Sequence, residues 1–204
     1  MKCGTRSLAV LGALALSAMG LVPAAWAADM SQSGEASPGL VDTPISDIQA
    51  VGEGDDSAMV GATVTTVGVV TAAYPAAESG LGATLDGYTI QSPGSGGTWE
   101  PGRTRSDGLF VYADKKGEIP APGTCVRVTG TVGEFPATSA KGNPQSLTQL
   151  AATSVSVVEG CQAPTPIPAS NVPTPDEAEA LESMLLAPQG TWTITDNYQT
   201  NQYG

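Results

Sequence analysis

The sequence contains no histidine among its 204 residues. A Ser-His-Asp triad or a Cys-His pair therefore cannot form, because both need an imidazole to take the proton of the nucleophile. No G-x-x-x-x-G-K segment occurs, which excludes a phosphate-binding loop of that type. Cysteine is scarce, and the two cysteines outside the amino-terminal segment cannot supply the four ligands of a structural zinc site without histidine.

Basic residues are also few, with eight Lys and Arg against 20 Asp and Glu. An acidic chain is repelled by nucleic acid at long range, which counts against tight, sequence-independent DNA binding. Beyond residue 27 all basic residues fall between positions 103 and 141, a window of net charge +2, while the rest carries −16. The window indicates either a locally positive region on an acidic body or a solvated surface. These residues are Arg103, Arg105, Lys115, Lys116, Arg127 and Lys141.

The amino terminus has the pattern of a secretory signal peptide. Lys2 and Arg6 precede the apolar stretch Ser7–Ala25, and a small-x-small pattern ends at Ala27. We predict cleavage after Ala27, which leaves a secreted, extracellular protein of net charge −14 with no membrane attachment. The alternative is a single membrane anchor, because the apolar stretch is nearly long enough to span a bilayer. Glycine and proline within the stretch, and the lack of a basic cluster after it, favour cleavage.

Two cysteines, Cys125 and Cys161, remain after cleavage. A pair of cysteines in an oxidising compartment predicts one disulfide. The bond would close a loop of 36 residues and contribute about 3.8 kcal/mol in the chain-entropy model. Two separate thiols are the alternative.

Short segments rich in β-branched residues, separated by turn residues and without helices between them, predict an all-β domain. Alternation is clearest in the fourth segment, where valines alternate with Arg127 and threonines, as in a strand with one buried and one wet face. Five or six such strands favour a sandwich or a barrel, and their number suits a small Greek-key barrel. The segments are Thr63–Ala72, Gly87–Gln91, Gly108–Tyr112, Cys125–Val132, and one or two strands within Gln145–Leu150 and Thr153–Val158.

The residues on either side of the predicted strands fall into segments of different composition. Ile45 and Ile48 are predicted to hold a short segment against the core, and Thr174 caps a helix predicted over Asp176–Leu186. A final strand is predicted over Thr191–Thr195. The predicted order is a disordered lead-in at 28–43, the barrel domain at 44–162, a proline-rich linker at 163–175, and a helix plus strand at 176–204, the start of a truncated C-terminal region.

A series of motifs in this order resembles the N-terminal half of secreted bacterial endonucleases. The motifs are Ile45–Gln49, Val64–Val70, Gly87–Gln91, Ser106–Tyr112, Val126–Val132 with Glu134-Phe135, Leu147–Leu150, Glu182–Leu185, Thr193–Tyr198 and Tyr203-Gly204. The resemblance implies an OB-fold-like region followed by a catalytic domain of the endonuclease/exonuclease/phosphatase class, a hydrolase that works around a divalent metal such as Mg²⁺. Here the sequence ends at the Tyr-Gly motif and has no histidine. No catalytic or metal-binding residue is therefore carried over, and the metal would belong to the missing domain.

OB-type barrels bind single strands through a basic groove and aromatic side chains on which bases stack. Five residues are candidates for such a patch: Arg103, Arg105, Phe110, Tyr112 and Arg127. The alternative is that Phe110 lies in the core and Tyr112 packs over the barrel end.

Three functions remain open. The first is an accessory, non-catalytic region of a secreted nuclease that helps to present DNA to a C-terminal nuclease domain. The second is a structural or adhesion module that binds a cell-surface polymer or glycan. The third is an intact small enzyme. Two close acid pairs, Asp55/Asp56 and Asp176/Glu177, could in principle cleave glycosides, but an acidic turn and a helix cap explain them. The turn at Gly52–Asp56 also lacks the distal acid of a calcium-binding loop.

Overall fold

The computed structural model describes residues 41–52, 56–75, 85–114, 117–135, 146–171 and 173–193, all within the unit Gly39–Gly204. No helix in these residues is long and apolar enough to cross a membrane. Several sequence predictions fall outside the described residues: the signal peptide, the lead-in up to residue 40, Asp55, the three lysines of the basic window, and the end of the chain from residue 194.

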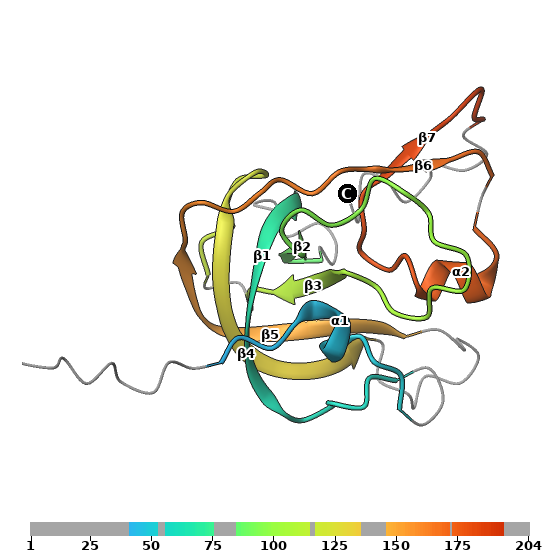
Figure 1. The fold of residues 1–204 in the computed structure, drawn as a ribbon. Helices are drawn as coiled ribbons and strands as arrows, with labels where there is room; N and C mark the ends of the chain where they lie inside the picture. Colours follow the sequence, from blue (N-terminus) through green and yellow to red (C-terminus); the bar gives the residue numbers. More distant parts are fainter. Residues whose placement is uncertain are drawn as a thin grey trace, which may run out of the picture. The chain divides into compact units, whose positions relative to one another are not determined.

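Five strands form a closed barrel in the order β1-β2-β3-β5-β4 (Figure 1), which confirms the all-β prediction. β3 and β5 run parallel, and the other neighbouring strands run antiparallel. The predicted second and third strands have the observed bounds, whereas the first and fourth run further and the last two segments form one strand. The strands are β1 (Thr63–Tyr74), β2 (Gly87–Gln91), β3 (Gly108–Tyr112), β4 (Cys125–Phe135) and β5 (Leu147–Val157).

The barrel interior contains the alternate apolar residues of each strand. In β4 the three valines are at most 1% exposed, whereas Arg127 and Thr131 are exposed, as the alternation predicts. Ile45 and Ile48 of the short helix α1 (Ile45–Ile48) join the same cluster, which confirms their predicted contact with the core. The cluster contains Ile45, Ile48, Val64, Val70, Tyr88, Ile90, Leu109, Val111, Val126, Val128, Val132 and Leu150.

Gly68 lies within β1, where a core side chain packs against the backbone. A Cβ atom at this position would lie 2.8 Å from Cβ of Ile90, so Gly68 is the point where a core side chain meets the backbone. The irregularity in β1 lies further on, between Val70 and Ala72. The close contact is therefore what requires glycine at position 68.

The predicted helix over Asp176–Leu186 is too long. α2 (Pro175–Glu179) ends after five residues and is followed by turns, with Ser183 at a φ of 57°. The predicted start is confirmed: the Thr174 side chain accepts a hydrogen bond from the Glu177 amide, and the Glu177 carboxylate accepts one from the Thr174 amide at 2.9 Å. After Glu179 the chain continues in turns, and the carbonyl oxygen of Glu182 and the amide of Leu185 bond to the barrel, as described below.

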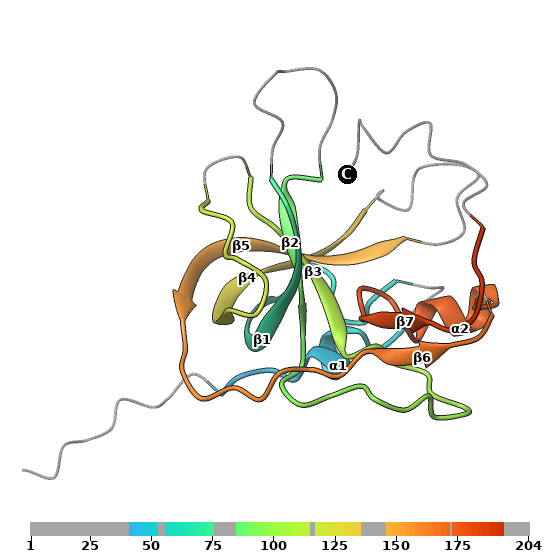
Figure 2. The ribbon, with the colours of Figure 1, turned by 90° about the horizontal axis from the view of Figure 1, so that it is seen from above.

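A two-stranded parallel sheet joins β6 (Ile167–Ala169) to β7 (Leu186–Pro188). Residues 163–175, predicted as a proline-rich linker, thus contain a strand, and Ile167 is only 2% exposed. Proline is compatible with such a strand because an edge position needs no amide donor on its open side. The strand predicted at Thr191–Thr195 is absent from its described part, 191–193, since the C-terminal strand lies five residues earlier. Figure 2 shows α2, β6 and β7 lying together beside the barrel.

Candidate functional site

Arg103 and Arg105 lie in the loop between β2 and β3, and each is paired with an acid. Arg103 donates to the Asp107 carboxylate and, through Nε, to the carbonyl oxygen of Arg105 at 2.8 Å. Its side chain is only 14% exposed, so it has a clear role in holding the loop. Arg105 donates to Oδ1 of Asp47 at 3.2 Å, and its side chain remains 51% exposed. Of the two, Arg105 is the one that a ligand can reach.

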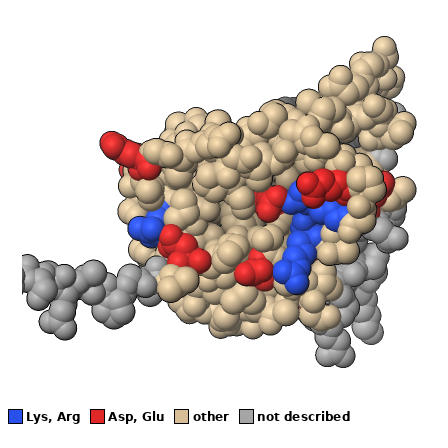
Figure 3. All heavy atoms as spheres, viewed as in Figure 1, with Lys and Arg blue, Asp and Glu red and all other residues tan. Residues whose placement is uncertain are grey.

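Arg127 projects from the outer face of β4. Its Nε and Nη2 donate to the two carboxylate oxygens of Asp42 at 3.0 and 2.7 Å. These hydrogen bonds, with the charge of Asp42, raise the pKa of Arg127 above its already high value. Figure 3 shows the described basic side chains in two separate groups on one face, each next to acidic side chains. The structure therefore does not bring Arg127 together with Arg103 and Arg105.

Phe110 and Tyr112 lie on the same side of β3, because side chains two residues apart share a face. Leu109 and Val111 supply the interior cluster from this strand, and neither aromatic residue is part of that cluster. Phe110 is nevertheless buried, as the alternative to a ligand-binding role predicts: it is 3% exposed, and its ring centroid lies 6.4 Å from that of Tyr74. Its ring is therefore not presented for base stacking in this structure.

Tyr112 is half-buried at the end of β3. Its hydroxyl donates to Oδ1 of Asp114 at 3.4 Å. Burial, followed by the negative charges of Asp114 and Asp86, raises the pKa of Tyr112. An aromatic residue beside acids is a poor platform for an anionic strand, because the phosphates would be repelled.

Residues 182–185 cover the outer face at the start of β3. Ser106 donates to the carbonyl oxygen of Glu182 at 2.5 Å, and the amide of Leu185 donates to Oε1 of Gln91 at 2.9 Å. Gln91 is fully buried although it points away from the barrel interior. The outer face of β2 and β3 is thus partly occupied by the chain itself.

A glycine makes this contact possible. A Cβ atom at Gly108 would lie 2.4 Å from the carbonyl carbon of Ser183 and 2.5 Å from the carbonyl oxygen of Glu182. We expect Gly108→Ala to displace residues 182–185 and to lower the free energy of unfolding by about 1–3 kcal/mol. Urea denaturation measures the loss, and hydrogen exchange at the Leu185 amide reports the displacement. Gly133→Ala is the matched control, because nothing lies within 4 Å of its Cβ position. Unchanged exchange at Leu185 in Gly108→Ala would contradict the contact.

Glu182 lies at the centre of a buried polar network. Gln49 Nε2 donates to Oε1 of Glu182 at 2.9 Å and to the carbonyl oxygen of Gly108 at 2.7 Å. The amide of Thr148 donates to Oε2 of Glu182 at 3.4 Å. The network therefore connects the C-terminal segment to α1, β3 and β5.

A second carboxylate, that of Glu134, reaches the same threonine. Its Oε1 accepts from Oγ1 of Thr148 at 3.0 Å and from the amide of Ser57 at 2.8 Å. Its Oε2 is buried and has no partner among the described residues. Burial raises the pKa of Glu182 to about 7, and the charges of Glu179 and Glu134 add to the rise while the bonds from Gln49 and Thr148 oppose it. No sequence pattern singles out this pair, because the two acids lie 48 positions apart.

In the acid pairs Asp55/Asp56 and Asp176/Glu177, the contacts that the structure describes are structural ones. Asp56 accepts a hydrogen bond from Ser146 at 3.1 Å, and Glu177 is engaged in the helix cap. Within the described ranges, no group of three or more His, Cys, Asp or Glu side chains is placed to hold a metal ion. The best-defined polar arrangement is the network around Glu182, and its partners are backbone groups and side chains of the barrel.

The Cys125–Cys161 pair forms the predicted disulfide, with the two Cα atoms 6.0 Å apart. Cys125 begins β4, and Cys161 follows β5. The bond therefore ties the chain just after the last barrel strand, where the C-terminal part from residue 158 begins, to the start of β4. No protein-family model matches this chain, and no curated protein matches its sequence.

Proposed function

We propose that this chain is the non-catalytic accessory region of a secreted nuclease, built on an OB-like Greek-key barrel that binds single-stranded DNA weakly. The observation that carries the proposal is the closed order β1-β2-β3-β5-β4 with β3 parallel to β5. Five-stranded barrels of the OB type use this arrangement and commonly bind oligonucleotides. The motif series that resembles secreted endonucleases supplies the link to a nuclease and to its metal-dependent catalytic domain.

The contact with DNA is assigned to the loop before β3. A hollow of about 480 Å³ lies there, with Arg103 and Arg105 in its wall beside the hydroxyl side chains of Ser46, Ser95 and Thr104. Arginine and hydroxyl groups are ordinary phosphate ligands. Glu100 and Asp107 line the same hollow, so the net attraction is small and the binding is weak and confined to low salt.

Arg105→Ala is expected to weaken binding of a labelled single-stranded oligonucleotide about fivefold at low salt, because one phosphate contact is lost. The slope of log K against log salt concentration should fall by about 0.7. Fluorescence anisotropy at several salt concentrations measures both quantities. Arg127→Ala is the control, since it removes the same charge from the separate group on β4 and should leave binding nearly unchanged. Equal retention of DNA by the two variants and the unmodified protein would refute the proposed contact.

A structural module is the second candidate, and the packing of residues 182–185 on β3 favours it. A barrel whose outer face holds the C-terminal segment is suited to orienting a domain attached after that segment. In this alternative the module attaches the nuclease to a cell-surface polymer or glycan and makes no contact with DNA. Retention on cell-wall polymer, together with no salt-sensitive affinity for the oligonucleotide, would favour it.

A further inference from the structure

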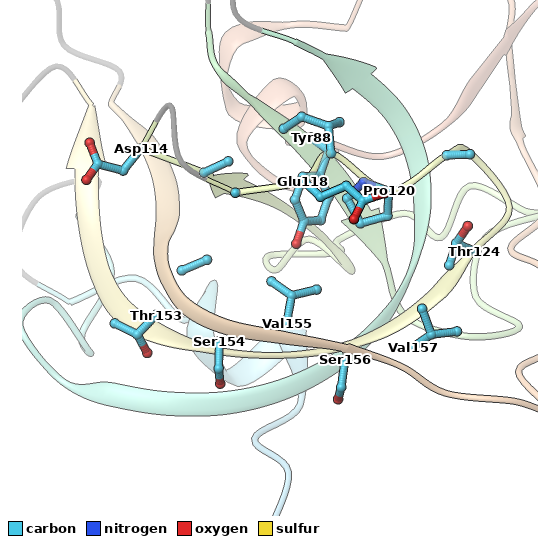
Figure 4. A pocket seen from close by; sticks show the side chains of 15 residues that line it. Tyr88, Asp114, Glu118, Pro120, Thr124, Thr153, Ser154, Val155, Ser156 and Val157 are labelled. Carbon is cyan, nitrogen blue, oxygen red and sulfur yellow. The ribbon is translucent and has the colours of Figure 1, made fainter.

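A cavity of about 800 Å³ opens where the barrel strands separate (Figure 4). One wall is the second half of β5, residues 153–157, and the other is the connection between β3 and β4. We propose that this cavity binds an extended peptide strand, which pairs with the open edge of β5 and places one side chain against the hydroxyl of Tyr88.

The first observation is the open edge itself. β3 pairs with β5 only at Gln149, Leu150 and Ala151, and no described strand pairs with that edge from residue 152 onward. An unpaired edge presents a row of amide donors and carbonyl acceptors that can accept another strand. Addition of a peptide to such an edge is a recurring mode of recognition.

The register shows which backbone groups face this edge. The amide of Val158 donates to the carbonyl oxygen of Cys125, directly opposite, so these two residues form a hydrogen-bonded pair. Hydrogen-bonded and non-hydrogen-bonded pairs alternate along an antiparallel ladder. Ser156 therefore also bonds to β4, opposite Arg127, whereas Val155 and Val157 direct their N–H and C=O groups to the open edge.

The second observation is the hydroxyl of Tyr88. The side chain is 1% exposed, and the hydroxyl has no partner among the described residues. Figure 4 shows it pointing into the cavity toward Val155. Burial raises the pKa of Tyr88 to about 12, so the group keeps its proton at neutral pH and offers a donor to the occupant. A buried hydroxyl without a partner is costly, and an acceptor on the peptide would remove that cost.

The lining suits a peptide better than a sugar or a base. Val155 and Val157 pair with the core residues Val128 and Val126, yet they are 41% and 71% exposed because the barrel opens beside them. Tyr88 is the only aromatic residue in the wall that the structure describes, and its ring is buried. Bases and sugars need an exposed aromatic face, whereas a strand needs backbone groups and apolar contacts.

Charge narrows the class of peptide. The charged wall residues that the structure describes are Asp114 and Glu118, both acidic, in a chain of net charge −12. Lys115 and Lys116 lie between them in the sequence but outside the described residues. A peptide with alternating small polar and valine-like residues and a basic end suits this chain, because its net charge of −12 repels an acidic strand.

The test uses blocked hexapeptides with Lys at one end, Val at alternate positions, and Ser, Thr, Asn or Val at the central position. Each is titrated to millimolar concentration into the isotopically labelled protein. We expect NMR shifts confined to residues 153–157 and 117–121, with slower hydrogen exchange at the Val155 and Val157 amides. The same peptides methylated on alternate backbone nitrogens should not bind, because strand pairing needs those donors. No shift with any peptide, or equal binding of the methylated set, would overturn the proposal.

Two variants test the named groups. Tyr88→Phe should weaken the best peptide about fivefold while keeping or raising the melting temperature of the free protein, because it removes an unpaired polar group. Val157→Pro should weaken binding about tenfold or more, since it removes a donor from the open edge and spares the bonds to β4. Tyr74→Phe removes a hydroxyl outside the cavity and should bind as the unmodified protein does. Unchanged affinity in both test variants would also overturn the site.

Discussion

Raising the pH from about 5 to about 8 is expected to lower the free energy of unfolding by about 3 kcal/mol, and Glu182→Gln is expected to remove most of that dependence. The cause is the burial of the Glu182 carboxylate against Gln49 and Thr148, where the charge of Glu134 also raises its pKa. Both carboxylates interact with Thr148, and Oε2 of Glu134 is buried without a hydrogen-bond partner among the described residues.

The direction follows from the two protonation states. In the unfolded chain the pKa of Glu182 is near 4.5, and in the folded chain it is about 7. A raised pKa means that folding favours the protonated carboxyl, so the stabilisation is fully present below about pH 4.5. It decreases as the pH rises and is lost once the pH passes about 7, because the buried group must then carry a charge. Gln49 and Thr148 donate to the charged form, but the effects of burial and of Glu179 and Glu134 are larger.

Urea denaturation at pH 5, 6, 7 and 8 would measure this dependence, at about equal ionic strength. Glu177→Gln is the control for loss of a glutamate, because hydrogen bonds from Thr174 lower the pKa of Glu177. Its contribution is present above its usual pKa and is lost on acidification, so the slope between pH 5 and 8 should stay the same. A flat profile in the unmodified protein, or an equal slope in Glu182→Gln, would contradict the buried carboxyl.

Breaking the disulfide is expected to cost about 3.8 kcal/mol, whether by reduction or by the double substitution Cys125→Ala and Cys161→Ala. The bond spans 36 positions, and its loss returns conformational freedom to the unfolded chain. In the folded chain it also holds the start of the C-terminal segment beside the β2–β3 loop, where Gly94 donates to the carbonyl oxygen of Gln162 at 2.9 Å.

Thermal unfolding with and without reductant measures the cost. The melting temperature should drop on reduction, and the double variant should match the reduced protein and no longer respond to reductant. Hydrogen exchange at the amides of Gly94, Gly97 and Thr165 should become faster, because their bonds join the loop to the released segment. An unchanged midpoint after complete reduction would show that the bond contributes nothing to stability.

The strands of the barrel were predictable from local pattern. β-branched residues alternate with polar ones in β4, and the buried valines and the exposed Arg127 follow that alternation. The cysteine pair was predictable from a count, since two cysteines lie beyond the predicted signal peptide and a pair in an oxidising compartment favours one bond. In both cases the information lies within a few residues or within a simple count, so no knowledge of distant packing was needed.

The C-terminal part was harder to predict because its structure depends on distant partners. Apolar spacing after Thr174 suggests a helix as far as Leu186, but Gln91 binds the Leu185 amide and Ser106 binds the Glu182 carbonyl. These partners lie 94 and 76 positions earlier in the chain, and their bonds take the place of helical ones at the Leu185 amide and the Glu182 carbonyl. Likewise β7 forms where Ile167 and its neighbours offer a partner, although the β-branched residues lie further on.

The amino-acid sequence alone determined the all-β class of the fold and the lack of histidine-based chemistry. It also determined which side chains of a strand such as β4 are buried and which are exposed. Tertiary structure decided which side chains meet: it separated Arg127 from Arg105, buried Phe110, and placed Glu182 beside Glu134. Among the strands that the structure describes, it also left the edge of β5 unpaired at Val155 and Val157. The physical reason is that alternation and composition are local properties, whereas ion pairs, buried acids and open edges arise only when distant segments are closed into a barrel.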